Sequence, residues 1–153
     1  MIETTLCYIE QNNQYLMLHR TKKKKDPNSG KWVGVGGKIE KGESVEECLL
    51  REVREETGLE LIKYQYRAKI YFYSDIYYNE IMHLYTASEF TGDLIECEEG
   101  ELVWIDKFKV LELNLWQGDK IFIQRLLEDD NKPFILHLYY EGDKLVKVDE
   151  EAL

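Results

Sequence analysis

The sequence predicts an α/β sandwich with a mixed central sheet and few helices. Most of the chain alternates apolar and polar residues with the period of two that a β-strand requires. Two segments have the helical period instead. The chain has 153 residues, no internal repeat and no low-complexity segment. We therefore expect residues 1–153 to form a single domain around one hydrophobic core.

The chain begins with two strand-like runs, residues 2–9 and 15–20. Asn12 and Asn13 lie between them, and asparagine tolerates the left-handed backbone of a tight turn. The two runs therefore predict a β-hairpin.

A basic loop follows this hairpin. Four lysines at 22–25 lead into the turn-forming residues 26–30. One interpretation is a solvated loop, and the other is a mobile cationic flap beside an anionic ligand. Residues 32–35 then predict a short strand that runs into Gly36 and Gly37, where we expect a tight turn that exposes a carbonyl group.

The clearest helix signal covers residues 45–57. Ser44 precedes it and Glu47 follows three residues later, which is the pattern of a capping box. Gly58 is placed to end the helix, because glycine adopts the left-handed conformation of a C-terminal cap.

The second half of the chain predicts mostly strands. Residues 61–73 and 79–88 favour two long antiparallel strands, and residues 102–105 favour a shorter one. Apolar residues at helical spacing between 116 and 127 predict a second helix that packs on the sheet. Residues 133–150 read as a terminal hairpin.

Three carboxylates on the first helix have an unusual position. Glu52, Glu55 and Glu56 fall within an arc of roughly 100° around the helix axis, and Cys48 and Leu49 project from that same arc. Glutamates on a solvated face should instead lie opposite the apolar stripe. We expect the three glutamates to lie toward the protein interior.

Carboxylates packed this closely repel one another and need a cation, a proton or an arginine. Clustered oxygen ligands favour Mg²⁺, and Mn²⁺ is also possible. The alternative is an ordinary charged helix in which Arg51 pairs with Glu55 at i,i+4.

Composition limits the partners and the compartment. The formal net charge of −10 argues against a nucleic-acid polymer, although a small nucleotide can bind through metal ions. The three cysteines form no CxxC pair, which indicates a reducing, cytoplasmic location. We see no signal peptide and no apolar run of membrane-spanning length, so we expect no membrane association. The sequence leaves a monomer and a homodimer equally open.

Residues 37–59 resemble the signature of the Nudix hydrolases. The signature fixes or restricts nine positions, and each of them matches here. They are Gly37, Glu43, Arg51, Glu52, Val53, Glu55, Glu56, Gly58 and Leu59. The resemblance implies an α/β/α sandwich with a mixed central sheet and a catalytic loop-helix-loop.

The resemblance also implies roles. Glu52, Glu55 and Glu56 would bind the metal with the carbonyl group of Gly36, and Arg51 would orient a carboxylate. Outside the signature, the acidic loop before residues 102–105 contains Glu99, which we assign as a further metal ligand or general base. An ordinary acidic loop is the alternative for Glu99.

The resemblance narrows to MutT-type hydrolases of oxidised purine nucleoside triphosphates, especially the human-like branch. Candidate substrate-binding residues follow from position along the chain; they are Thr5, Arg20, Trp32, Val33, Lys38, Trp116 and Asp119. Two departures weaken base recognition. Val33 stands where the branch has an asparagine, and Gly118 stands where it has a second aspartate.

These features predict a Mg²⁺-dependent hydrolase of oxidised purine nucleoside triphosphates such as 8-oxo-dGTP, which releases a nucleoside monophosphate and pyrophosphate. Such an enzyme would cleanse the nucleotide pool before DNA synthesis. One alternative is a Nudix pyrophosphatase of ADP-ribose, a nucleotide sugar or a dinucleotide. Another is a nucleotide-sensing module without turnover.

Overall fold

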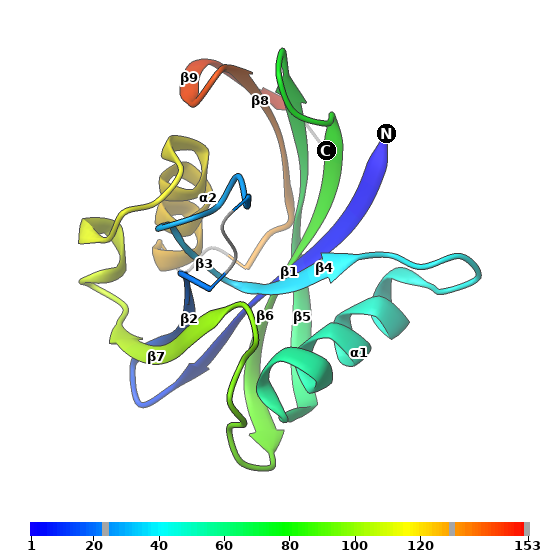
Figure 1. Ribbon diagram of the computed structural model, residues 1–153, viewed down its shortest axis with the longest axis vertical. Coiled ribbons are helices and arrows are strands. Elements are labelled where there is room, and N and C mark those ends of the chain that lie inside the picture. Colours follow the sequence, from blue (N-terminus) through cyan, green and yellow to red (C-terminus); the bar gives the residue numbers. More distant parts are fainter. Residues whose placement is uncertain (23–24, 129–130, 152–153) are drawn as a thin grey trace.

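The computed structural model describes residues 1–22, 25–128 and 131–151, and two α-helices lie on opposite faces of a mixed sheet (Figure 1). This arrangement confirms the predicted fold class. The strands are β1 (Ile2–Gln11), β2 (Gln14–Arg20), β3 (Trp32–Val33), β4 (Val35–Lys38), β5 (Glu60–Ser74), β6 (Glu80–Thr91), β7 (Gly100–Asp106), β8 (Phe134–Glu141) and β9 (Lys144–Glu151). The helices are α1 (Val45–Thr57), the short 3₁₀ helix η1 (Val110–Glu112) and α2 (Gln117–Leu127).

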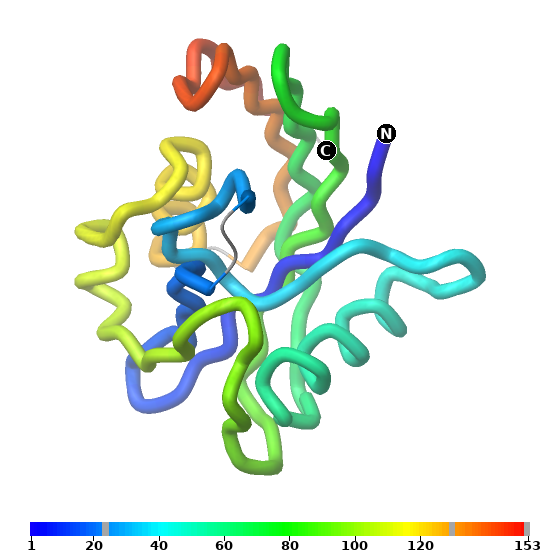
Figure 2. The backbone as a smooth tube through the Cα atoms, in the orientation of Figure 1, coloured from blue at the N-terminus to red at the C-terminus, as the bar shows by residue number. Residues whose placement is uncertain are grey.

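Strand β1 organises the sheet. It pairs in parallel with β6 and antiparallel with β4, and its end forms a hairpin with β2. The path β3-β2-β1-β6-β5-β8-β9 joins the remaining strands, and β7 pairs with β2. The β5–β6 and β8–β9 hairpins project at the same end of the molecule (Figure 2). The backbone N–H of Gly142 joins their tips by donating to Asp75 Oδ1 at 2.8 Å.

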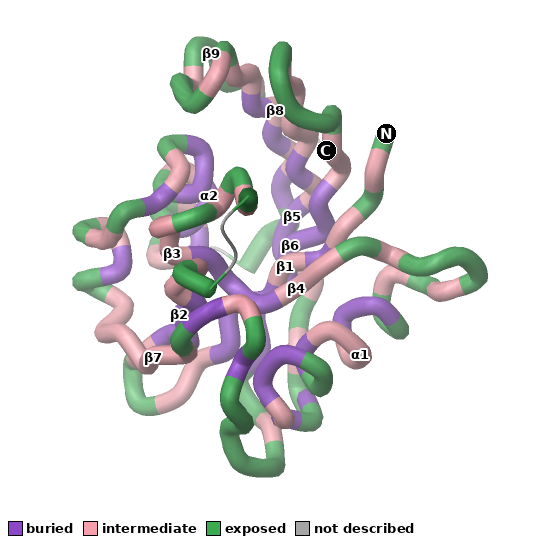
Figure 3. The backbone as a smooth tube through the Cα atoms, viewed as in Figure 1, coloured by how far each residue is buried: buried purple, intermediate pink, exposed green. Residues whose placement is uncertain are grey.

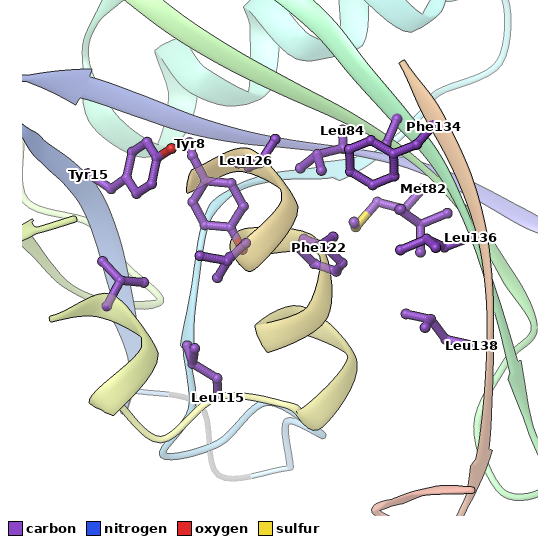
Figure 4. Packing of buried hydrophobic residues seen from close by; sticks show 14 of the residues in the cluster. Tyr8, Tyr15, Met82, Leu84, Leu115, Phe122, Leu126, Phe134, Leu136 and Leu138 are labelled. Carbon is purple, nitrogen blue, oxygen red and sulfur yellow. The ribbon is translucent and has the colours of Figure 1, made fainter. Parts of the chain in front are cut away.

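The two faces of the sheet carry separate cores because side chains alternate along each strand. On β1, Cys7 and Ile9 pack toward α1, and Tyr8 packs toward α2. Buried residues lie along the strands and exposed residues lie at the hairpin tips (Figure 3). On the α2 side, Phe122 meets Leu136 and Met82 from the sheet (Figure 4).

Helix α1 has the predicted bounds and caps. The Ser44 hydroxyl accepts a hydrogen bond from the Glu47 backbone N–H at 3.1 Å, and the Glu47 carboxylate accepts one from the Ser44 N–H. Gly58 closes the helix with a φ of 80°. These contacts are local in sequence, which is why the sequence pattern was sufficient to predict them.

The predicted turn at Gly36 and Gly37 is wrong. Both residues lie in β4, where they pair with Leu6 and Thr5 of β1. Close packing explains why both residues are glycines. A Cβ atom on Gly36 would lie 1.9 Å from the Thr5 carbonyl oxygen, and one on Gly37 would lie 2.5 Å from the carboxyl carbon of Glu52.

The basic loop is only partly described. Lys23 and Lys24 of the expected flap lie outside the described residues. Lys22 donates to the Cys97 carbonyl oxygen at 2.9 Å. Within the described ranges, neither helix has the length and apolar character to cross a membrane.

The different neighbours of the two glycines give a prediction. Gly36→Ala should lower the free energy of unfolding by about 3 kcal/mol, because its methyl group meets fixed backbone. Gly37→Ala should cost much less, because its methyl group meets the end of a flexible side chain. Urea denaturation of both variants measures the difference, and equal losses would contradict this explanation.

Candidate active site

Arg51 of α1 joins the carboxylates of the signature. Its guanidinium donates to both carboxylate oxygens of Glu43, at 2.6 and 3.0 Å. It also donates to Glu52 at 2.8 Å and to Glu55 at 3.1 Å. A fourth contact at 3.1 Å reaches the Lys38 carbonyl oxygen. This geometry agrees with the expected role of Arg51 in orienting carboxylates, and it includes the i,i+4 pair with Glu55.

The bidentate Arg51–Glu43 pair fixes the charge of both groups. The hydrogen bonds from Arg51 lower the pKa of Glu43 to about 2, and a bond from the Glu40 backbone adds to this effect. Glu43 in turn raises the pKa of Arg51 above its ordinary value. The carboxylate of Glu43 therefore stays charged at neutral pH, and it ties the loop before α1 to the helix.

Glu56 is the most buried of the three helix glutamates, with a residue exposure of 9%. Its carboxylate accepts a hydrogen bond from the Gly36 N–H at 3.2 Å. Burial, followed by the nearby carboxyl group of Glu99, raises the pKa of Glu56 to about 9. Burial also raises the pKa of Glu52. Glu55 differs from the sequence expectation, because its side chain is 59% exposed.

Arg20 lies at the end of β2 and holds two carboxylates. It donates to Asp26 at 2.7 Å and to Glu99 at 2.9 Å. The predicted phosphate-side residue therefore lines the cavity described below while its guanidinium is engaged with these two carboxylates. Through Arg20, the loop after β2 is linked to the acidic loop that contains Glu99.

The carboxylates are close together, but they do not form a preformed metal-binding site. Among the residues that the structure describes, no group of three or more Asp, Glu, His or Cys side chains is arranged to hold a metal ion. The reason is that Arg51 binds oxygens of Glu52 and Glu55, and Arg20 binds an oxygen of Glu99. The residues still fit a cation. The Glu56 carboxyl group, whose pKa is raised by burial and then by the neighbouring Glu99, needs nearby positive charge to ionise at neutral pH.

A cavity of about 350 Å³ opens beside this cluster. Gly36 and Gly37 of β4 line it, and these are the glycines that contact Glu56 and Glu52. The cavity continues along the α2 face of the sheet to the joined hairpin tips, where Tyr77 lines it. One end of the cavity is therefore beside the acidic cluster, and the other is walled by aromatic residues.

Trp116 lies in the cavity wall and not in the core. Its indole N–H donates to Asn28 Oδ1 at 2.7 Å. Tyr77 and Tyr140 meet its ring edge-on, with centroid distances of 6.3 and 5.6 Å. The Nζ atom of Lys31 lies 5.0 Å from the ring centroid. Three separate chain segments therefore fix the orientation of the indole ring.

Asp119 lies in the first turn of α2, lines the cavity and is 6% exposed. None of the described residues donates a hydrogen bond to its carboxyl group. Burial, and then the charge of Glu80, raises the pKa of Asp119 to about 8, although Lys31 acts in the opposite direction.

Thr5 lines the cavity, and its hydroxyl group meets helix α1. Its hydroxyl group lies 3.4 Å from the Cys48 sulfur on the α1 side of the sheet. The next residue toward the terminus, Thr4, takes the other face, and its hydroxyl donates to Glu80 Oε2 at 2.6 Å. Thr4 and Glu80 both line the cavity. The hydroxyl groups of the two threonines therefore have their partners on opposite faces of the sheet, and both residues line the cavity.

Of the three remaining candidates for substrate binding, one lines the cavity and two do not. Val33 lines the cavity. Trp32 is not among the lining residues, because its ring stacks on His19 with a centroid distance of 4.3 Å. Lys38 is also absent from the lining, although its Nζ atom lies 6.0 Å from the ring of Tyr78, which does line the cavity.

Sequence reasoning missed Thr4, Glu80, Tyr77 and Tyr140. Glu80 and Thr4 come together because β1 and β6 run in parallel with Thr4 opposite Met82 and Ile2 opposite Glu80. Alternation within each strand could have placed them on the α2 face, but the register between the strands was needed to bring them together.

Known proteins resemble this chain over most of its length. The family model described as NUDIX domain matches residues 2–126. An uncharacterised Nudix hydrolase of Bacillus subtilis (strain 168), YvcI, is 34% identical over 120 residues, which cover 75% of this chain and 72% of that protein. An oxidized purine nucleoside triphosphate hydrolase of Danio rerio is 30% identical over 133 residues, 84% of this chain and 83% of that protein. The crystal structure of a MutT protein from Bacillus halodurans has a TM-score of 0.88 and 27% identity, and covers 99% of this chain and 98% of that one.

The raised pKa of Glu56 predicts a pH-dependent stability in the metal-free protein. Between the ordinary value of 4.5 and the folded value of about 9, the folded state binds more protons than the unfolded chain. Its stability should therefore fall as the pH rises through this window. Glu56→Gln remains neutral and should lose less stability between about pH 5 and about pH 9. Urea denaturation in the presence of a chelator measures this change.

Glu46→Gln provides the control, because Glu46 lies on the same helix and is exposed. It should keep the pH dependence of the original protein. The same dependence in Glu56→Gln would show that Glu56 is not held in its protonated form.

Proposed function

Because this chain belongs to the Nudix hydrolase family, we propose that it is a divalent-cation-dependent hydrolase of nucleoside triphosphates, with an oxidised purine nucleotide such as 8-oxo-dGTP as its preferred substrate. The products would be the nucleoside monophosphate and pyrophosphate. One observation carries the proposal: a single cavity extends from Gly36 and Gly37, which contact Glu56 and Glu52, to an aromatic wall containing Trp116. A phosphate chain and a base can thus occupy its two ends.

Divalent cations belong at the acidic end. Glu52, Glu56 and Glu99 would hold them, together with Glu55 and the Gly36 carbonyl group. When bound, Mg²⁺ or Mn²⁺ would neutralise phosphate charge and lower the pKa of a bound water molecule. The glycines of β4 support this assignment, because they allow the backbone to approach Glu52 and Glu56 closely.

The chain's own residues would position the reaction. Arg51 fixes the orientation of Glu52, and the Gly36 N–H fixes that of Glu56. Water would add to a phosphorus atom beside the α–β bridge, and the bridging P–O bond would break. The proton of the water would pass to a carboxylate, for which Glu99 is our candidate. Its contact with Arg20 keeps Glu99 at the edge of the cavity.

The aromatic end would bind the base. Trp116 supplies a ring of suitable size for stacking on a purine, and its orientation is fixed by Asn28. Asp119 supplies a buried polar group within the same wall. The preference for an oxidised purine is taken from the relative in Danio rerio, whose name states that activity.

The compartment is part of the proposal. All three cysteines are free and buried. Thiols in this state are consistent with a reducing compartment such as the cytoplasm.

The proposal is tested by hydrolysis of a substrate panel with and without Mg²⁺. We expect pyrophosphate release to be fastest from 8-oxo-dGTP, followed by dGTP, and to be slow from ADP-ribose and dinucleoside polyphosphates. A chelator should abolish turnover. Glu56→Gln and Glu52→Gln should each lower kcat by a factor of about 10³ without unfolding the protein. Glu46→Gln should keep full activity.

Several outcomes would overturn parts of this assignment. Fastest cleavage of ADP-ribose or of a dinucleotide would replace the substrate class. Equal rates for 8-oxo-dGTP and dGTP would remove the preference for the oxidised base. Nucleotide binding without any turnover would indicate a sensing module. Normal Mg²⁺-dependent turnover in Glu56→Gln would contradict the assignment of the site.

A further inference from the structure

Two carboxyl groups, one buried and one half-buried, line the base end of the cavity, and the phosphate chemistry uses neither. They belong to Asp119 of α2 and Glu80 of β6. We propose that Glu80 determines base specificity, and that its carboxyl group and that of Asp119 together bind the hydrogen-bonding edge of a guanine-type base. This inference rests on the proposed function and adds a residue that the signature does not contain.

Glu80 is built into the pocket by the sheet. As the first residue of β6, it lies opposite Ile2 of β1 and Phe72 of β5. It shares a sheet face with Met82, which packs in the core behind the cavity. The Thr4 hydroxyl holds one of its oxygens at 2.6 Å. The position of Glu80 is therefore set by rigid strands and not by a loop.

Asp119 faces Glu80 from the helix side. It is 6% exposed, and none of the described residues donates a hydrogen bond to it. Its carboxyl oxygens are not among the enclosed polar atoms that lack a partner, so they open to the cavity, where a ligand can supply a hydrogen bond. Asp119 lines the cavity, so this ligand is a molecule that enters it.

The surroundings of the two carboxyl groups affect their pKa values differently. Asp119 is buried, and its surroundings contain Glu80, Lys31, Tyr8 and Tyr140. Burial raises the pKa of Glu80 too, but the hydrogen bond from Thr4 acts in the opposite direction. Glu80 thus has a hydrogen-bond donor that stabilises its ionised form, and Asp119 has none among the described residues, so Asp119 is the group of the pair that favours the protonated form.

This pair matches one class of base. The edge of guanine presents two adjacent donors, N1–H and the 2-amino group, followed by the acceptor O6. An ionised carboxylate accepts both donors side by side, as Glu80 can, and a protonated carboxyl group donates to O6, as Asp119 can. Adenine presents one donor and one acceptor, which a single protonated carboxyl group satisfies. The second carboxyl group therefore favours guanine over adenine.

Binding of nucleoside monophosphates without metal tests the inference separately from hydrolysis. In calorimetric titrations, Glu80→Gln should weaken dGMP binding by about tenfold or more, because an amide cannot accept both donors. Its affinity for dAMP should change by less than about threefold. Asp119→Asn should keep dGMP binding within about threefold, because the amide can still donate to O6.

The pH profile gives a second readout that a purely structural role would not change. The affinity of the original protein for dGMP should fall as the pH rises above about 8, where Asp119 loses its proton. Asp119→Asn should lack this fall. Glu89→Gln is the matched control, since Glu89 is an exposed residue of the same strand and should leave all affinities unchanged.

The outcomes separate the two proposals. If Glu80→Gln is folded by thermal denaturation and binds dGMP as tightly as the original protein, the role of Glu80 is overturned, whatever the hydrolysis assay gives. If dGMP affinity falls as expected while no triphosphate is cleaved, the base pocket stands and the proposed hydrolysis fails. Equal losses for dGMP and dAMP would also overturn the specificity claim.

Discussion

The site depends on one interaction, the contact of the Arg51 guanidinium with the carboxylates around it. Four glutamates of the signature lie within residues 43–56, and their mutual repulsion would open the helix–strand junction without a fixed positive charge. Arg51 binds Glu43, Glu52 and Glu55 and reaches the Lys38 carbonyl oxygen. It thereby joins the loop, the helix and β4 into one unit. Arg51 does not contact Glu56, whose pKa is raised to about 9, so Glu56 is protonated at neutral pH in the metal-free protein.

The two faces of the sheet carry different parts of the proposed function. The acidic cluster lies at the junction of α1 and β4, and base recognition lies between the sheet and α2. The glycines of β4 form the thin wall between these regions, since a side chain at either position would collide with β1 or with Glu52. The same narrow strand allows one cavity to reach both ends. This shared cavity makes a nucleotide, with its anionic and aromatic parts, the ligand class that fits best.

Local patterns in the sequence predicted local structure well. Helix α1 was predicted to the residue, because its caps are contacts within a few positions. The partners of the Thr4 and Thr5 hydroxyl groups and the placement of Trp32 on His19 were not predictable, because they depend on which face of a strand meets which partner. Gly36 and Gly37 suggested a turn, but the cause of their small size lies in contacts with distant residues. Glu80 was missed for the same reason, since only the register of β6 against β1 and β5 places it in the cavity.

The central claim is that the acidic cluster is assembled to hold divalent cations. Titration of the nucleotide-free protein with Mn²⁺, followed by electron paramagnetic resonance, tests it most directly. We predict saturable Mn²⁺ binding whose affinity falls by about tenfold or more in Glu56→Gln. The affinity should also fall at lower pH, because protons compete with the metal for the carboxylates. Mn²⁺ binding of equal affinity in Glu56→Gln and the original protein would contradict it.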